Sequence, residues 1–380
     1  MSLLKIIQNL VKQKLEEKVK AEKSYKLNVM VKTSVPVIIG DTKIFPGEKK
    51  LIELSISGIY TQSPISIPVH VINGKKDGPV LLIIAGIHGD EINGIEIIRR
   101  LLRSSKFKNL NGTLIAIPII NIYGFISLSR YLPDRRDLNR SFPGSEKGSL
   151  ASRLANMLMS EIIVKCTHVI DLHTGAIHRS NLPHVRANLE NKNTKKIAKS
   201  FSLPIILDNK SIDGSLRQAC DELNIPLILY EGGEALRFDE LSIRAGVKGI
   251  RNVMHYLDML PTRTTKKASS ILPKIGKSSK WTRAPTSGIF HPMKQLGEQV
   301  EKGESIGIIV NPFGTEETSI ISLTSGIIIG RNNIPMVNEG DALFHIVSFK
   351  DTSSISPKIE VLEELGPYIS GPLFDIQTTK

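Results

Sequence analysis

A histidine and a glutamate in a glycine-rich turn are the side chains of this sequence best suited to bind a metal ion. His88 and Glu91 lie three positions apart in the segment Gly86-Ile-His-Gly-Asp-Glu-Ile-Asn-Gly94. A turn of this kind at the start of a helix can point both side chains at one place, where they offer an imidazole nitrogen and a carboxylate oxygen. The spacing alone is weak, because His168 and Asp171 show the same offset. The position of His88 after an apolar, strand-like run favours it as a ligand.

A second strand-like run ends in another histidine. The segment Val169-Ile-Asp-Leu-His-Thr-Gly175 places His173 at the end of the run and Asp171 on the same face. Two protein ligands hold zinc poorly, whereas three ligands and a position open to water are typical of catalytic zinc sites. We therefore predict one Zn²⁺ per chain, held by His88, Glu91 and His173, with Asp171 orienting a ligand. A histidine satisfied by backbone groups is the alternative for His173.

An arginine-rich loop follows the strand-like run that ends near Asn121. It contains Arg130, Arg136 and the segment Asp137-Leu-Asn-Arg-Ser-Phe-Pro-Gly144. Clusters of this kind are often solvated loops or phosphate-binding patches. The adjacent residues Asn139 and Arg140 could instead grip a carboxylate, because guanidinium geometry favours a two-point contact.

A carboxylate also ends the run Leu227-Ile-Leu-Tyr-Glu-Gly-Gly-Glu234. Glu231 is followed by two glycines, which allow another group to approach closely. A general base should lie near the metal-bound water, and Glu231 is the candidate. Glu234 is an alternative base, and a helix-capping role is the alternative for Glu231 itself.

The elements around these motifs predict how the motifs meet. Buried strands are predicted at residues 80–85, 113–120, 168–172 and 226–230, and helices at 95–102, 149–164, 213–224 and 239–259. Strands that alternate with helices indicate an α/β sheet covered on both faces. Ligands bind such sheets beyond the carboxyl ends of the strands, and His88, His173 and Glu231 all follow strands. The pattern therefore predicts one site at one sheet edge.

The flanking regions have different patterns. Residues 3–22 carry apolar side chains at helical spacing, residues 27–75 predict short strands and turns, and the basic, polar residues 261–280 predict a linker. Beyond the linker, Thr286-Ser-Gly-Ile289 recurs as Thr324-Ser-Gly-Ile327. The repeat predicts a small β sandwich with two pseudo-repeats. The expected divisions are an N-terminal extension (1–50), a catalytic domain (51–260), the linker (261–280), the β-sandwich domain (281–350) and a tail (351–380).

The β-sandwich segment resembles carrier domains of the biotinyl/lipoyl type. A carrier would present a lysine at the hairpin between its halves, but the corresponding residues 311–317 contain none. We therefore expect a module that shapes the protein or supports a homo-oligomer, rather than a swinging arm.

The amino-acid composition limits the classes of function that we expect for this protein. The 380 residues include 50 Lys and Arg against 37 Asp and Glu, a net charge of +13, which could attract nucleic acid or anionic lipid. Aromatic residues are only 5%, however, and residues 262–280 alone hold six basic residues and no acid, so we expect no nucleic-acid partner. No apolar run approaches the roughly 20 residues of a membrane span. Two distant cysteines, Cys166 and Cys220, lead us to expect a reducing cytoplasm.

The motifs G-x-H-G-D-E, D-L-N-R-S-F-P-G and D-L-H-T-G, in this order, resemble the succinylglutamate desuccinylase/aspartoacylase family, which is related to the zinc carboxypeptidases. The resemblance covers about residues 50–350. It implies a zinc-carboxypeptidase-like mixed sheet with helices on both faces, followed by a small C-terminal β domain of the biotinyl/lipoyl-like, barrel-sandwich type.

The resemblance also implies roles for the candidate residues. Asn139 and Arg140 match a pair that binds a substrate carboxylate. Arg130 matches an upstream arginine that stabilises the oxyanion of the tetrahedral intermediate, although its spacing to Asn139 is longer than in aspartoacylase, so Arg136 is a rival. Glu231 matches the glutamate that activates the zinc-bound water and later protonates the leaving amine.

We therefore expect a zinc-dependent amidohydrolase of the deacylase type, acting on an N-acyl amino acid or a similar small, carboxylate-bearing substrate. One alternative is a peptidase-like enzyme that trims a terminal acidic residue from a peptide or polyglutamyl tail. Another is a basic adaptor that binds RNA or a membrane surface through residues 1–26 and 262–280. For His178 and His184, which follow His173 closely, we expect core or loop roles.

Overall fold

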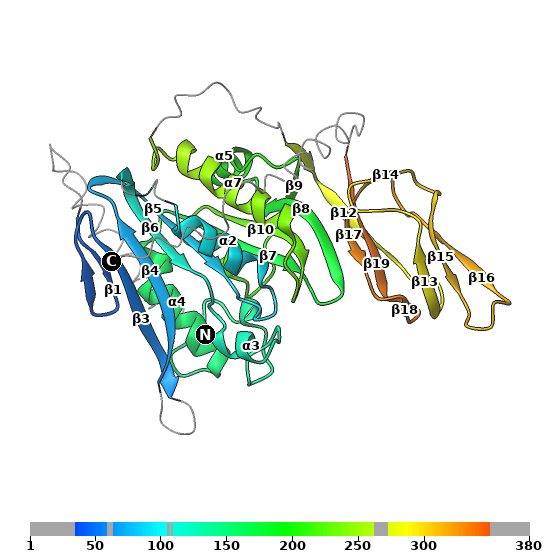
Figure 1. Ribbon diagram of the computed structural model, residues 1–380, viewed down its shortest axis with the longest axis horizontal. Coiled ribbons are helices and arrows are strands. Elements are labelled where there is room, and N and C mark those ends of the chain that lie inside the picture. Colours follow the sequence, from blue (N-terminus) through cyan, green and yellow to red (C-terminus); the bar gives the residue numbers. More distant parts are fainter. Residues whose placement is uncertain (1–34, 59–63, 105–106, 108, 262–272, 350–380) are drawn as a thin grey trace, which may run out of the picture.

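The computed structural model describes residues 35–58, 64–104, 107, 109–261 and 273–349. They form an α/β unit (residues 35–261) and a β unit (residues 273–349), which lie end to end (Figure 1). The predicted helix at 3–22, the predicted tail at 351–380 and residues 262–272 of the predicted linker lie outside the described residues.

The chain alternates strands and helices in its first unit and contains strands in its second. The strands of the α/β unit are β1 (Val37–Ile39), β2 (Thr42–Ile44), β3 (Lys49–Gly58), β4 (Pro64–Asn73), β5 (Lys76–Ala85), β6 (Asn111–Ile117), β7 (His168–Gly175), β8 (Arg179–Ala187), β9 (Ile205–Asp208) and β10 (Leu227–Glu234). Its helices are α2 (Asn93–Leu102), α3 (Ile122–Ile126), α4 (Leu150–Glu161), α5 (Lys192–Ser200), α6 (Leu216–Glu222) and α7 (Glu240–Tyr256), with short 3-10 helices at Leu138–Arg140 and Ile163–Lys165. The strands of the β unit are β11 (Lys274–Gly276), β12 (Ser278–Arg283), β13 (Gly288–Pro292), β14 (Gln299–Val300), β15 (Ser305–Val310), β16 (Glu317–Ile321), β17 (Gly326–Asn332), β18 (Met336–Val337) and β19 (Ala342–Ser348).

A 13-stranded mixed sheet runs through both units. Its main order is β12-β19-β17-β8-β10-β7-β5-β6-β4-β3, with β9, β11 and β14 paired at its side. At the centre, β7 lies parallel to both β5 and β10. Because parallel strands end at the same edge, the turn after β5 and the ends of β7 and β10 are brought together there.

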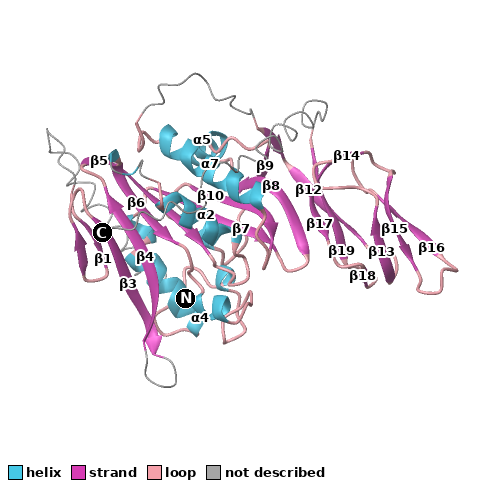
Figure 2. Ribbon diagram, viewed as in Figure 1, coloured by secondary structure: helices cyan, strands magenta, loops and turns pink. Residues whose placement is uncertain are grey.

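Helices cover both faces of the sheet in the α/β unit (Figure 2). Helices α2, α5 and α7 pack on one face, where Ile97, Ile197 and Ile250 join the core. Helices α4 and α6 pack on the other face, where Leu154 and Leu216 are buried. The predicted mixed α/β architecture is confirmed, whereas its likeness to the zinc carboxypeptidases stays a prediction. Among the described residues, no helix is both long and apolar enough to cross a membrane.

Among the elements of the α/β unit that were not predicted are β8, α5 and β9. Strand β8 is antiparallel to β10 and has polar residues among its apolar ones, including Asn181, His184 and Arg186, so it lacks a continuous apolar run. Helix α5 is rich in lysine and asparagine and buries only Thr194, Ile197 and Ala198. The patterns are weak because polar residues interrupt β8, β9 has only four residues, and α5 buries only a narrow face.

The predicted linker at 261–280 is partly wrong. Strand β11 pairs in parallel with β9, and β12 begins at Ser278. The edge of β9 would otherwise leave backbone N–H and C=O groups unpaired, which β11 satisfies. Strand β17 also pairs with β8, so that the sheet continues from one unit into the other. Since one sheet joins the two units, the domain boundaries stay predictions.

The β unit packs two sheets over a common core. A second sheet of four strands, β16-β15-β13-β18, lies against β17 and β19, and Phe290 and Phe344 meet edge to face between them. The two sequence repeats cap each other's turns: Ser325 Oγ accepts from Lys302 N and Ser287 Oγ accepts from Glu339 N, both at 2.9 Å. The two repeats thus occupy equivalent places. The likeness to biotinyl/lipoyl domains stays a prediction.

Gly94 lets helix α2, which follows the turn of His88 and Glu91, lie close to the sheet. A β-carbon at this position would lie 2.7 Å from Ala85 Cβ and 2.8 Å from Leu172 Cβ, neither of which can rotate away. We expect Gly94→Ala to lower the free energy of unfolding by about 1–3 kcal/mol in denaturant titrations. Arg103→Ala, at the exposed end of this helix, should change it by less than about 0.5 kcal/mol. Equal stability of Gly94→Ala and wild type would contradict this packing.

Candidate active site

A sharp turn after β5 places His88 and Glu91 together. Gly86 has a φ of 64°, a left-handed conformation that a side chain would strain, and Glu91 N donates to His88 O at 3.2 Å. Both side chains are buried, with 3% and 2% of their surface exposed. His88 Nδ1 lies 2.7 Å from Glu91 Oε1, so the two side chains meet as the sequence predicted.

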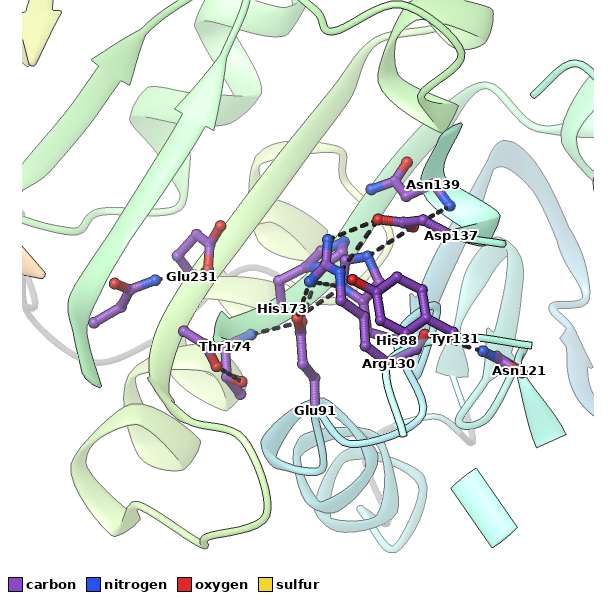
Figure 3. A network of polar contacts seen from close by, with 12 residues as sticks. His88, Glu91, Asn121, Arg130, Tyr131, Asp137, Asn139, His173, Thr174 and Glu231 are labelled. Carbon is purple, nitrogen blue, oxygen red and sulfur yellow. Dashed lines mark hydrogen bonds and ion pairs between the residues drawn. The ribbon is translucent and has the colours of Figure 1, made fainter. Parts of the chain in front are cut away.

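The end of β7 brings His173 to the same point. Its Nδ1 lies 2.9 Å from Glu91 Oε2, and Thr174 N donates to that oxygen at 3.0 Å. Figure 3 shows the three side chains converging. Their ligand atoms lie within 4.8 Å of one another. Two imidazoles and a carboxylate are a donor set that zinc commonly uses, so this cluster could hold a metal ion.

A carboxylate supports the second nitrogen of each imidazole. His173 Nε2 lies 2.9 Å from Asp171 Oδ2, and His88 Nε2 lies 3.2 Å from Asp137 Oδ1. Outer carboxylates of this kind fix the orientation of the imidazole and raise its basicity. The contact of Asp171 agrees with the role expected for it. Asp137 was missed, although its place at the start of the D-L-N-R motif was a signal.

The charges of the cluster compensate for its burial. Burial raises the pKa of Glu91, but His88 and His173 lower it more, so this pKa lies well below its ordinary value. Burial lowers the pKa of His173, but Asp171 and Glu91 raise it well above its ordinary value. Glu91 is therefore ionised near neutral pH, as a metal ligand must be.

Arg130 lies beside the cluster. Its Nη1 is 3.3 Å from Glu91 Oε1, and its Nη2 donates to Asp137 Oδ2 at 2.9 Å. The rival Arg136 has a side chain that is 63% exposed, and its Nε lies 3.9 Å from Asp134 Oδ2. Of the two predicted oxyanion arginines, Arg130 is the one next to the cluster.

A cavity of about 250 Å³ opens over the cluster. Five arginines and two glutamates line it, together with smaller polar and apolar groups, so its charge suits an anionic ligand. These charged residues are Arg130, Arg140, Arg179, Arg186, Arg217, Glu91 and Glu231. Trp281 of β12 also lines the cavity, so both units contribute to its wall.

Glu231, near the end of β10, projects into this cavity (Figure 3). Asn181 Nδ2 donates to Glu231 Oε2 at 2.9 Å, and Arg186 Nη1 lies 3.6 Å from Glu231 Oε1. The alternative, Glu234, is not among the described residues that line the cavity, and it accepts a bond of 2.7 Å from Asn333 Nδ2. Glu231 is therefore the candidate base that can reach a bound substrate.

The D-L-N-R loop presents Asn139 and Arg140 to the cavity. Asp137 Oδ1 accepts from Asn139 N at 2.8 Å, and Asn139 Oδ1 accepts from Leu216 N at 3.0 Å, which ties the loop to the start of α6. Arg140 Nη1 donates to Asn139 O at 2.6 Å. The two residues are thus adjacent and fixed at the cavity, on the side that α6 covers.

The remaining histidines near His173 lie elsewhere. His178 is exposed, and its carbonyl accepts from Asn333 N at 2.7 Å. His184 is fully buried, with its Nδ1 2.7 Å from Leu182 O. These positions agree with the loop and core roles expected for them. The cavity residues that sequence analysis missed include Arg179, Asn181, Arg186, Arg217 and Trp281.

Comparison with known proteins agrees with the family resemblance of the sequence motifs. Residues 77–257 match the model of the succinylglutamate desuccinylase/aspartoacylase catalytic domain. The N-alpha-acetyl-L-2,4-diaminobutyric acid deacetylase of Halomonas elongata is 23% identical over 313 residues, which cover 80% of this chain and 88% of that protein. These matches confirm the resemblance seen in the sequence. The named relative is a deacetylase, which confirms the expected class of amide-bond hydrolases.

Solved structures share the fold. A succinylglutamate desuccinylase/aspartoacylase from Rhodobacter sphaeroides has a TM-score of 0.70 at 24% identity and covers 80% of this chain and 95% of its own. The product-bound ectoine utilization protein EutE (DoeB) from Ruegeria pomeroyi has a TM-score of 0.72 at 22% identity, with coverages of 84% and 99%.

Replacing a residue of the cluster should selectively weaken metal binding. We expect His173→Ala to lower zinc affinity by more than the roughly 10- to 100-fold typical of losing an outer partner, because it removes one of three ligands. Isothermal titration with Zn²⁺ and elemental analysis after dialysis would measure this. His178→Ala, in the exposed loop beyond β7, serves as the control and should bind zinc like the wild type. Equal zinc binding by the two variants would rule out the cluster.

Proposed function

We propose that this chain, whose residues 77–257 belong to the succinylglutamate desuccinylase/aspartoacylase family, deacylates a small N-acylated compound that bears a carboxylate. The observation that carries the proposal is that a buried cluster of two histidines and a glutamate shares one cavity with the carboxylate of Glu231. A metal site beside a base is one arrangement that catalyses the hydrolysis of an amide by water.

Zinc is the metal proposed for the cluster. His88, Glu91 and His173 would hold it, and its donor set of two imidazoles and one carboxylate is that of known catalytic zinc sites. When bound, zinc supplies a water of lowered pKa and a Lewis acid for the amide carbonyl. Asp137 and Asp171 accept from the outer imidazole nitrogens and hold the rings in place.

Glu231 is the proposed general base and acid. It takes a proton from the attacking water and later delivers a proton to the leaving nitrogen, since an amine leaves poorly as an anion. Asn181 holds Oε2 of this carboxylate, while Oε1 makes only the longer contact with Arg186. Oε1 is therefore the oxygen that can exchange a proton with substrate.

Arg130 is the proposed stabiliser of the oxyanion. Asp137 accepts from its Nε and Nη2, which fixes the guanidinium, and its Nη1 faces the cluster. A fixed donor aimed at developing negative charge can lower the barrier by about 2.7–4 kcal/mol. Asn139 and Arg140 would bind the substrate carboxylate and so set the amide beside Glu231.

The size of the cavity supports a small substrate. A cavity of about 250 Å³ has room for a small N-acyl amino acid. The peptidase-like alternative stays a prediction, because the remainder of a peptide could extend from the cavity into solvent. The adaptor alternative rests on residues 1–26 and 262–280, most of which lie outside the described residues, and it stays a prediction.

The proposed base can be tested by one isosteric change. Glu231→Gln keeps the shape of the side chain but cannot accept the proton, so kcat with an N-acyl amino acid should fall by about 10²- to 10⁴-fold. The zinc content should stay that of the wild type, because Glu231 is not among the three ligands. Glu234→Gln, outside the cavity, is the matched control and should retain activity. A fully active Glu231→Gln enzyme would refute the assignment.

The proposed binding of the substrate carboxylate by Asn139 and Arg140 predicts that KM depends on Arg140. Arg140→Leu removes a charge-assisted contact, so KM for an N-acyl amino acid should rise by about 10- to 100-fold. Arg136→Leu removes an arginine from the same loop, but outside the cavity, and should leave KM unchanged. Steady-state kinetics of both variants would measure the difference. A similar rise in both would show that the loop contributes only general positive charge.

A further inference from the structure

One arginine of the cavity wall has no acceptor among the described residues. Four of the five cavity arginines contact protein oxygens: Arg130 with Asp137, Arg140 with Asn139 O, Arg186 beside Glu231, and Arg217 with Asn209. The guanidinium of Arg179 has no hydrogen bond or ion pair with any residue that the structure describes. Arg179 is half-buried at the cavity wall, so water or an anionic ligand in the cavity would satisfy its donors.

Arg179 is held by an aromatic side chain of the β unit. Its Cζ lies 5.4 Å from the ring centroid of Trp281, within the range of a cation–π contact. Trp281 stacks in turn on His345, with ring centroids 4.7 Å apart and planes within 8°. Burial and the charge of Arg186 lower the pKa of His345 to about 3, so its ring is neutral near pH 7. The contact orients Arg179 without neutralising its charge.

The junction of the two units fixes this arrangement. Asn332 of β17 pairs with Arg179 of β8, and Gly330 pairs with Asn181. A β-carbon at Gly330 would lie 3.0 Å from both Asn181 Oδ1 and His345 Cβ, so the two strands are tightly packed there. Asn181 also orients Glu231. The strand pairing that positions Arg179 thus belongs to the same wall as the proposed base.

We propose that Arg179, held over Trp281, is a specificity-determining residue that binds a second anionic group of the substrate. The inference rests on the proposed function and narrows its substrate class to compounds with a carboxylate in addition to the one at Asn139 and Arg140. A cationic group in this place would meet an uncompensated guanidinium. The chain should therefore disfavour compounds with a free amino group, such as the N-acetylated diaminobutyric acid in the name of the curated relative.

Four small N-acyl amino acids that differ in charge test the proposal on the full-length, zinc-loaded protein. N-acetyl-L-alanine carries one carboxylate, N-acetyl-L-glutamate adds one on the amine side, and N-succinyl-L-alanine adds one on the acyl side. Nα-acetyl-L-2,4-diaminobutyrate carries a cationic end. We expect kcat/KM for one of the two dianions to exceed that for the other three compounds by about 10- to 100-fold, the range of one charge-assisted contact. The preferred dianion identifies the side that Arg179 binds.

The variants separate Arg179 from the general charge of the cavity. Arg179→Gln should lose the preference for the dianion, because its kcat/KM should fall much more for the preferred dianion than for N-acetyl-L-alanine. Arg179→Lys keeps the charge but not the two-point contact, and should retain part of the preference. Trp281→Leu should reduce the preference by a smaller factor, because Arg179 loses its support. Arg237→Gln, an arginine outside the cavity lining, should keep both the rates and the preference.

The outcomes distinguish this inference from the proposed function. If the wild type hydrolyses N-acyl compounds without preferring a dianion, or if Arg179→Gln slows all substrates equally, the inference is overturned and the hydrolase stands. If zinc-loaded wild type hydrolyses none of the four compounds, the proposed function fails. Arg179 is then tested by isothermal titration with succinate and propionate, where a preference of the wild type for succinate that Arg179→Gln lacks would support the anion site. Equal binding of the two acids would overturn it.

Discussion

A buried carboxylate between two imidazoles is the constraint around which the rest of the site is arranged. Glu91 is 2% exposed, and an isolated charge at such a depth would be strongly unfavourable. His88, His173 and the backbone N–H of Thr174 all contact its oxygens. The imidazoles depend in turn on outer carboxylates, one of which also fixes Arg130. Loss of one member would therefore leave others buried without partners.

Sheet geometry brings these groups within reach of the candidate base. Strands β5, β7 and β10 are parallel, so the turn with His88 and Glu91 and the strand ends with His173 and Glu231 lie at one edge. The side chain of the fully buried Asn93, just beyond the turn, makes two hydrogen bonds that stabilise this edge. Its Nδ2 donates to Gly232 O, and its Oδ1 accepts from Asp239 N. The side chain of Asn93 thus connects the turn that carries His88 and Glu91 to Gly232, the residue that follows Glu231.

The β unit forms part of the cavity wall. It extends the sheet through β17, and it supplies Trp281 to the cavity wall. The sequence predicted a separate module after a linker, because a basic, proline-containing segment precedes it. Residues 274–280 instead contain parts of two strands, since the edge of β9 accepts β11. The wall of the positively charged cavity is therefore formed by both units.

The sequence by itself determined the α/β class, the identity of the three cluster residues and the loop with Asn139 and Arg140, because these depend on local patterns: apolar runs, glycine turns and polar residues at strand ends. Tertiary structure alone placed Arg130 rather than Arg136 beside Glu91, Glu231 rather than Glu234 in the cavity, and Trp281 against Arg179. Elements β8, α5 and β9 also escaped prediction. Such choices depend on distances between segments far apart in the chain, and a local pattern carries no information about which distant segment packs against it.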